Sequence, residues 1–214
     1  MRHPSKYIGR ACYQTTVERF LNTEKPDWIE IMSSEFAHVS GHGLAAQQRR
    51  AWDDEYDVLR KALAELPDEY KGLWVIFEYV MPLSRDGSEQ DPGVRPDVVV
   101  LAQDTVVIIE FKSRPEYRPF MRKQVMKYRN RIEKWHKESK GLYKRAVLVL
   151  TKSEEPLLIY DRKLWICSKD KLAEVLTTFP RPSMPPVRMG AGGMGPSAVR
   201  RWRESEWLLP DSEK

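Results

Sequence analysis

The chain has 214 residues, of which 41% are hydrophobic and 31% charged, with a formal net charge of +5. This length and composition fit one globular domain with insertions or an appendage, because enough apolar residues are present to build a core. No run of 18 apolar residues occurs and the first residues lead into no apolar segment, so we expect neither a membrane span nor a secretory signal. The basic balance fits a polyanionic partner, and two isolated cysteines predict a reducing, cytoplasmic setting.

The first half of the chain alternates between helical and strand-like patterns. A short helix is expected near residues 16–21, with irregular sequence from there to residue 42. An apolar stripe at helical spacing predicts a long helix over residues 43–66, which ends at Pro67. The members of the stripe are Leu44, Trp52, Leu59, Leu63 and Leu66. Segments rich in β-branched residues then predict strands, with a polar loop at 82–93 after the first of them. These strands are expected at 73–81, 96–101 and 105–112.

The second half continues the alternation and ends in an irregular segment. Pro119 suits the first turn of a helix and Gly141 its C-terminal cap, so a second long helix is predicted over residues 119–139. Strands at 145–151 and 164–167 and a helix near 169–178 are expected next. Residues 180–196 are rich in Pro, Gly and Met and are typical of a linker or arm. A final helix over 198–209 would carry Trp202 and Trp207.

The two strands at 96–101 and 105–112 are predicted to form a hairpin, because only three residues separate them. A turn centred between residues 103 and 104 sets Asp97 opposite Glu110, with Cβ atoms roughly 4.5–5.5 Å apart. Two like charges at this distance destabilise the hairpin. A hard cation that binds both carboxylates would replace their repulsion with attraction to the cation. Lys112 lies on the same face as Glu110. A register shifted by one residue would separate the two acids.

Both faces of this hairpin are apolar, so both need a cover of other residues. The two faces are Val98, Val100, Val107 and Ile109 on one side and Val99, Leu101, Val106 and Ile108 on the other. A sheet that is apolar on both faces is typical of an α/β architecture. We therefore expect a mixed central β-sheet flanked by helices on both faces.

The residues around the hairpin resemble a known family. Pro96-Asp97, a gap of 12 residues and then Glu110-Phe111-Lys112 resemble the P-D…(D/E)-x-K signature of the PD-(D/E)XK nuclease superfamily. Gln124 and Tyr128 are similar to the Q-x-x-x-Y motif of its RecB-like branch. The resemblance covers roughly residues 44–150. Upstream residues resemble, more narrowly, the nuclease-like domain found ahead of superfamily 1 ATPases in bacteria: Gln48, Trp52, Glu55, Leu59, Phe77-Glu78-Tyr79 and Met81-Pro82.

The resemblance implies a restriction-endonuclease-like core and hydrolysis of DNA phosphodiester bonds with Mg²⁺, or with Mn²⁺ in its place. It predicts a nuclease domain over residues 43–179, between an N-terminal extension (1–42) and a Pro/Gly-rich arm with a C-terminal helix (180–214). The chain carries no G-x-x-x-x-G-K-[ST] motif, so an ATPase or helicase partner would be a separate subunit. DNA processing, repair or defence would be the setting.

The candidate metal ligands are Asp97, Glu110, the carbonyl of Phe111 and one further acid. For that acid, Glu55 is the first choice and Glu78 the second, although the helix that carries Glu55 is acidic along its length. Lys112 would orient or help to deprotonate the attacking water, or stabilise charge on the phosphoryl oxygens.

Gln124 and Tyr128 are four residues apart and share one helical face. By resemblance, they would brace the catalytic groups or contact the DNA backbone, although Tyr128 could equally be a core tyrosine. Basic residues on the other face are candidates for binding nucleic acid, unless this is simply a solvated helix surface. The residues proposed for this role are Arg122, Lys123, Lys127 and Arg131.

Two other functions remain open from the sequence. The chain could be a catalytically silent nuclease-fold module that binds nucleic acid or a partner ATPase. It could also be a structural subunit that docks on a protein through the arm and the segment with Trp202 and Trp207. The sequence leaves open the oligomeric state, DNA against RNA, strand polarity and the choice between exonuclease and endonuclease.

Overall fold

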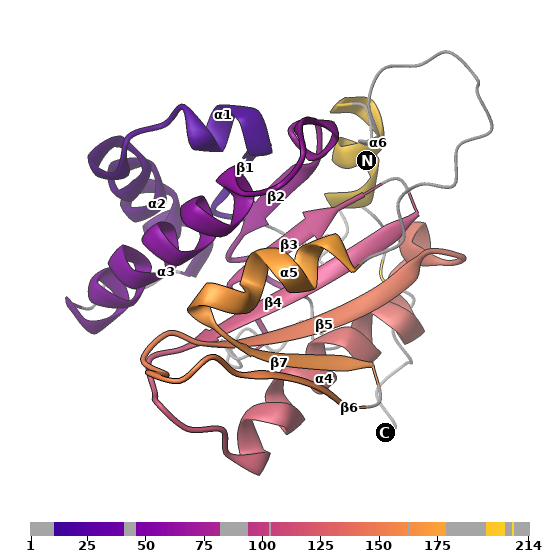
Figure 1. Cartoon of the computed structure of the whole chain (residues 1–214). Helices are drawn as coiled ribbons and strands as arrows, with labels where there is room; N and C mark the ends of the chain where they lie inside the picture. The colour runs from indigo at the N-terminus through magenta and orange to yellow at the C-terminus, as the bar shows by residue number, and fades with distance from the viewer. Residues whose placement is uncertain are drawn as a thin grey trace, which may run out of the picture.

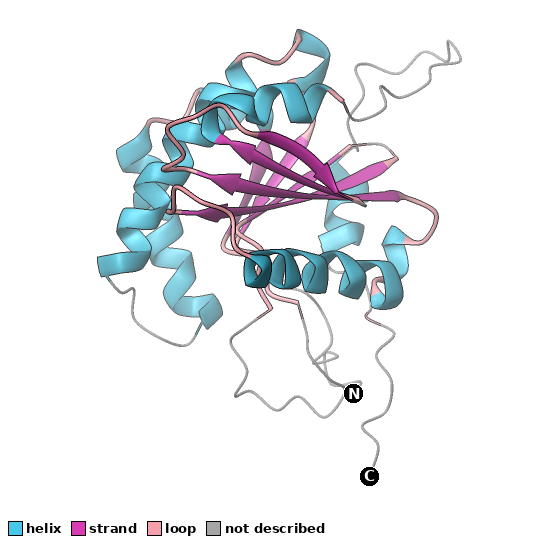
Figure 2. Cartoon of the chain, turned by 60° about the horizontal axis from the view of Figure 1, so that its bottom comes forward, coloured by secondary structure: helices cyan, strands magenta, loops and turns pink. Residues whose placement is uncertain are grey.

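The computed structural model describes residues 11–40, 46–81, 94–102, 104–161, 163–178, 196–203 and 207. These residues form a seven-stranded mixed sheet with helices on both faces (Figure 1). Figure 2 shows the sheet in cross-section, with helices above it and a long helix below it. The α/β class and the mixed sheet expected from the sequence are therefore confirmed. The predicted loop at 82–93 and most of the predicted arm, residues 180–195, lie outside the described residues.

The sheet is antiparallel in its first half and mainly parallel in its second. Its strand order is β1-β2-β3-β4-β5-β7-β6. Neighbours from β1 to β4 are antiparallel, β4, β5 and β7 are parallel, and β6 runs antiparallel to β7 at the edge. The strands are β1 (Tyr13–Thr16), β2 (Trp74–Phe77), β3 (Val98–Leu101), β4 (Thr105–Lys112), β5 (Tyr143–Leu150), β6 (Leu158–Asp161) and β7 (Leu164–Ser168).

The helices correct several predicted boundaries. The main helices are α1 (Val17–Leu21), α2 (Lys25–Ser40), α3 (Ala46–Ala64), α4 (Pro119–Trp135), α5 (Leu172–Thr177) and α6 (Pro196–Arg203). The prediction of irregular sequence up to residue 42 was wrong, because α2 occupies most of that segment. The second long helix ends at Trp135, and a separate 3₁₀ turn, η2 (Lys137–Ser139), follows it. The described part of the chain contains no helix with the length and apolarity needed to cross a membrane.

The hairpin register agrees with the prediction. Val98 pairs with Ile109 and Leu101 with Val106, so the numbers of paired residues sum to 207. The predicted faces are also confirmed, since Val98 and Ile109 belong to one core cluster and Val99 and Ile108 to another. Strand β2 is shorter than predicted. It ends at Phe77 because the next residue, Glu78, has a positive φ of 51° that breaks the extended backbone.

Helices α1, α2, α3 and α5 cover one face of the sheet, and α4 and α6 contribute to the core on the other. The segment expected as an N-terminal extension contributes Phe20 and Trp28 to the same core cluster as Trp52. The C-terminal segment contributes Trp202 and Trp207, each 1% exposed, to the cluster on the opposite face. Both ends of the described chain are thus built into one sheet and its cores.

The C-terminal tryptophans do not lie on one helix as predicted. Helix α6 ends at Arg203, and Trp207 instead forms an isolated β-bridge with His136. Because both indoles are buried in the protein's own core, they are not presented at the surface for docking. This finding removes the basis for a partner-binding surface built on Trp202 and Trp207.

Candidate active site

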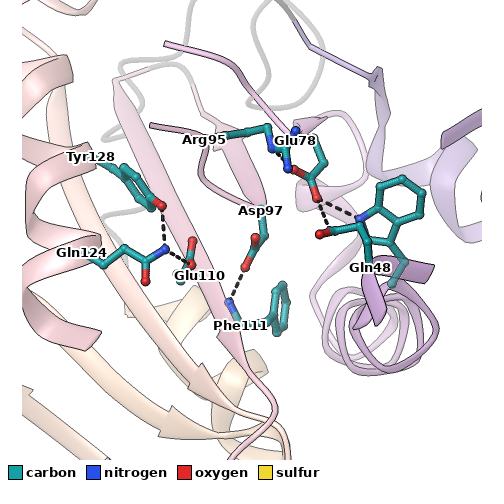
Figure 3. Close-up of polar contacts among 9 residues, drawn as sticks. Gln48, Glu78, Arg95, Asp97, Glu110, Phe111, Gln124 and Tyr128 are labelled. Atoms are coloured by element: carbon teal, nitrogen blue, oxygen red, sulfur yellow. Dashed lines mark hydrogen bonds and ion pairs between the residues drawn. The ribbon is translucent and has the colours of Figure 1, made fainter. Parts of the chain in front are cut away.

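The hairpin brings three of the predicted site residues together, and Figure 3 shows two of them, Asp97 and Glu110. Asp97 immediately precedes β3, and Glu110 and Lys112 lie at the end of β4. One carboxylate oxygen of Asp97, Oδ2, accepts a hydrogen bond from the backbone N–H of Phe111 at 2.7 Å. The Lys112 ammonium donates to Glu110 Oε1, also at 2.7 Å. The register predicted from a three-residue link therefore gathers the acids and the lysine.

Helix α4 brings Gln124 and Tyr128 to the same point. The side-chain amide of Gln124 donates to Glu110 Oε1 at 2.7 Å and lies 2.7 Å from the hydroxyl oxygen of Tyr128. The spacing of four residues places both side chains on the face that packs against the sheet. Burial, and next the charge of Glu110, raise the pKa of Tyr128. Tyr128 is thus buried in the core and also linked to Glu110 through Gln124.

The Glu110 carboxylate is only half satisfied. The residue is 2% exposed, and its Oε1 receives both Lys112 and Gln124. Its Oε2 is buried and receives no N–H or hydroxyl donor among the described residues, and only the neighbouring Asp97 carboxyl group can share a proton with the Glu110 side chain. An unpaired buried acceptor of this kind costs about 1–3 kcal/mol, and more when it is charged. A cation beside Oε2 would remove that cost.

Two further acids, Asp97 and Glu55, lie close enough to Glu110 to interact with it electrostatically. Burial is the main cause that raises the pKa of Asp97 to about 6. Burial and then the charge of Asp97 raise the pKa of Glu110 well above its ordinary range. Glu55, on α3, is 9% exposed, and burial followed by the charges of Asp97, Glu78 and Glu110 raises its pKa in the same way. The acid predicted first as the extra ligand therefore lies within electrostatic reach of the hairpin acids.

Both carboxylate oxygens of Glu78, the second choice for the extra ligand, already have partners. Its Oε1 accepts hydrogen bonds from Gln48 Nε2 at 3.0 Å and from Trp52 Nε1 at 2.8 Å. Its Oε2 pairs with Arg95 Nε at 2.5 Å. Sequence reasoning did not find the role of Arg95, although a charged residue directly before Pro96-Asp97 and close to apolar strands was a signal for it. Within the described part of the chain Glu55 has no such set of partners, so it stays the first candidate for the extra ligand.

The basic residues of α4 differ in how far they are available to a ligand. Lys123 and Lys127 are exposed. Arg122 is held by Asp161 at 3.0 Å, and Arg131 is partly buried and already engaged in an interaction. Arg129, a further basic residue of α4, is 7% exposed and donates to a backbone carbonyl. Lys123 and Lys127 are therefore the best placed of the four predicted nucleic-acid-binding residues.

The chain matches no protein-family model, no curated protein and no solved structure. In the described residues, no group of three or more His, Cys, Asp or Glu side chains is already arranged to hold a metal ion. The functional argument therefore depends on the chemistry of the cluster around Asp97 and Glu110, together with the motif residues that form it.

Proposed function

We propose that this protein is a metal-dependent nuclease that hydrolyses phosphodiester bonds in DNA, in DNA processing, repair or defence. Its sheet would be the restriction-endonuclease-like core of the PD-(D/E)XK nuclease superfamily. The observation that carries the proposal is the state of Glu110: one carboxylate oxygen is held by Lys112 and Gln124, and the other is buried beside Asp97 with no N–H or hydroxyl donor among the described residues. Strongly perturbed acids in contact with a lysine are typical of a catalytic site.

Asp97, Glu110, Glu55 and the Phe111 carbonyl would hold Mg²⁺, or Mn²⁺ in its place, because hard cations prefer oxygen ligands. Their oxygens fit such an ion, since the unpaired Glu110 Oε2 needs a positive neighbour. The bound ion would polarise the phosphate and lower the pKa of a water molecule. Because no three of the acids are already arranged around one point, binding would draw their side chains together.

The protein's own residues would position the reacting groups. Lys112 is held by Glu110 at 2.7 Å, so its ammonium is placed to orient the attacking water or to stabilise charge on the phosphoryl oxygens. Gln124 and Tyr128 would fix the orientation of Glu110. Lys123 and Lys127 would contact DNA phosphates, which gives salt-dependent binding without base recognition. A separate ATPase or helicase subunit is proposed as a partner.

The proposal is tested by incubating linear, circular and single-stranded DNA with the protein in Mg²⁺, Mn²⁺ or EDTA. We expect cleavage in either metal and none in EDTA, and we expect Lys112→Ala and Asp97→Ala to abolish it. Lys140→Ala, at an exposed lysine outside the cluster, is the matched control and should cut like wild type. Wild-type protein that binds DNA and leaves every substrate intact in both metals would instead indicate the catalytically silent module.

A further inference from the structure

Glu78 occupies an unusual position directly after β2. It is 2% exposed and has a left-handed backbone, with φ of 51°. A residue with a side chain pays about 1–3 kcal/mol for such a conformation, which persists only where the surroundings hold it in place. A buried carboxylate also needs partners to offset its loss of hydration. Both costs at one residue point to a specific role.

The contacts of Glu78 come from both sides of the candidate site (Figure 3). Its side chain accepts from Gln48 and Trp52 of α3 and pairs with Arg95, which precedes β3. Its backbone N–H donates to the carbonyl oxygen of Asp97 at 2.8 Å. Glu78 therefore contacts Asp97 itself and the helix that carries Glu55.

The spacing within each element shows what these contacts fix. Trp52 lies three residues before Glu55 on α3, so anchoring the Trp52 indole sets how deeply Glu55 reaches towards the hairpin. Arg95 lies two residues before Asp97 and is further held by Phe36 of α2, whose ring centre is 4.5 Å from the guanidinium carbon. Both candidate acids thus follow closely in sequence from a residue that Glu78 binds.

We infer that Glu78 is a positioning residue that ties α3 to the segment before β3 and thereby sets Glu55 and Asp97 relative to each other. It does not act as a metal ligand, because both of its oxygens are occupied by Gln48, Trp52 and Arg95. The consequence for catalysis rests on the proposed nuclease function. The structural tie itself does not, so the two can be tested separately.

The key variant is Trp52→Phe, which keeps an aromatic ring in the core but removes the N–H that Glu78 accepts together with part of the ring volume. Trp28→Phe is the matched control. Trp28 is 1% exposed and lies in the same core cluster, but its indole N–H has no hydrogen-bond partner among the described residues. The two variants lose similar ring volume, so their difference reports the loss of the hydrogen bond to Glu78.

The first readout is amide hydrogen exchange in peptides that cover residues 95–101, which requires no activity. We expect Trp52→Phe to speed exchange in this segment by about fivefold or more, while Trp28→Phe leaves it within about twofold of wild type. Glu78→Gln combined with Trp52→Phe should change exchange by less than the sum of the single effects, because the two residues act as one unit. Equal exchange at 95–101 in the two Trp→Phe variants would overturn the inference.

The second readout is the kinetics of DNA cleavage. Small misplacement of catalytic groups is expensive, so Trp52→Phe should lower kcat about tenfold or more with KM for DNA unchanged. A raised Mg²⁺ requirement in Glu78→Gln that is absent from Trp52→Phe would identify Glu78 as a ligand and overturn the inference. If wild type cleaves nothing while the exchange results hold, the tie stands and the nuclease proposal fails.

Discussion

Helix α4 contributes to two buried polar clusters of opposite character. Its C-cap residue, His136, belongs to a closed ring of hydrogen bonds. Trp202 Nε1 donates to Ser139 Oγ at 2.9 Å, the Ser139 hydroxyl donates to His136 Nδ1 at 2.7 Å, and His136 Nε2 donates to the Trp202 carbonyl at 2.9 Å. Each of these groups has a partner when the imidazole is neutral, and burial lowers the pKa of His136 to about 3.

The cluster that Gln124 contacts has the opposite character, because it is acidic. It gathers Asp97, Glu110 and Glu55, whose pKa values are all raised by burial, and in the described part of the chain one oxygen of Glu110 receives no N–H or hydroxyl donor. A satisfied neutral network stabilises the fold by itself, whereas an unsatisfied acidic cluster costs stability until something binds it. The difference fits a structural role for the His136 cluster and supports the proposed ligand-binding role of the acidic one.

The sharpest expected contrast is between activity and stability at Asp97. Asp97→Asn should lower the cleavage rate by about a thousandfold or more, which corresponds to roughly 4 kcal/mol of transition-state stabilisation. In EDTA the same variant should unfold in urea with an unchanged or higher free energy, because it removes one of several repelling buried charges. Parallel loss of activity and of metal-free stability would contradict this assignment.

The C-terminal cluster should respond in the opposite way. Trp202→Ala is expected to lower the free energy of unfolding by about 3–5 kcal/mol, because it leaves a cavity and opens the hydrogen-bonded ring. Arg201→Ala, at the exposed neighbouring position, should change stability by less than about 0.5 kcal/mol. Urea denaturation gives both values. A Trp202→Ala protein as stable as Arg201→Ala would show that the ring contributes little.

Substitutions of Gln124 and Tyr128, the Q-x-x-x-Y pair, should slow DNA cleavage to different extents. Gln124→Leu removes a hydrogen bond to Glu110 itself, so we expect cleavage to slow by about 10- to 100-fold at saturating DNA. Tyr128→Phe should have the smaller effect, because the hydroxyl is linked to Glu110 through Gln124. An equal or larger loss in Tyr128→Phe would mean that the hydroxyl acts directly on the substrate.

The pH dependence of metal-free stability should also differ in sign between the clusters. Asp97 has a folded pKa of about 6, above its ordinary value of 3.8, so the folded state keeps a proton that the unfolded state loses. Asp97 therefore contributes fully to the free energy of unfolding below pH 4. This contribution falls as the pH rises to 6, by at most about 1.4 kcal/mol per pH unit. His136, with its lowered pKa, contributes fully above pH 6.5 and loses stability as pH falls towards 3.

The two trends oppose each other between pH 4 and 6, so a variant is needed to separate them. Urea denaturation in EDTA should show that Asp97→Asn increases the dependence of stability on rising pH relative to wild type, since it removes the opposing contribution of Asp97 and weakens those of Glu110 and Glu55, whose pKa values its charge raises. Saturating Mg²⁺ should move the wild-type profile in the same direction, because a cation favours the ionised acids. Superimposable profiles for wild type and Asp97→Asn in EDTA would contradict the shifted pKa.

The hairpin and its acids could be predicted because local rules determine them. Two β-branched runs joined by three residues allow few registers, and the pairing of Val98 with Ile109 confirms the predicted one. The two alternating faces follow from the same register. Gln124 and Tyr128 share a face of α4 because of helical spacing alone, which needs no knowledge of the rest of the fold.

The missed features depend on contacts between distant segments. Strand β1, with the sequence Tyr-Gln-Thr-Thr, lacks a strong apolar alternation and is specified by pairing with β2. The tie between Glu78 and Arg95 crosses 17 positions and needs a positive φ that no local pattern in this sequence predicts. Trp207 lies outside α6 and instead packs against His136 in a buried site.

The most direct test of the central claim is calorimetric titration of Mn²⁺ into the protein without DNA. The claim is that Asp97 and Glu110 form a cation site, so wild type should bind Mn²⁺, and Asp97→Asn and Glu110→Gln should each bind it about tenfold more weakly or worse. Equal Mn²⁺ affinity in wild type and both variants would contradict the claim, because the excess negative charge at the end of the hairpin would then serve some purpose other than binding a metal.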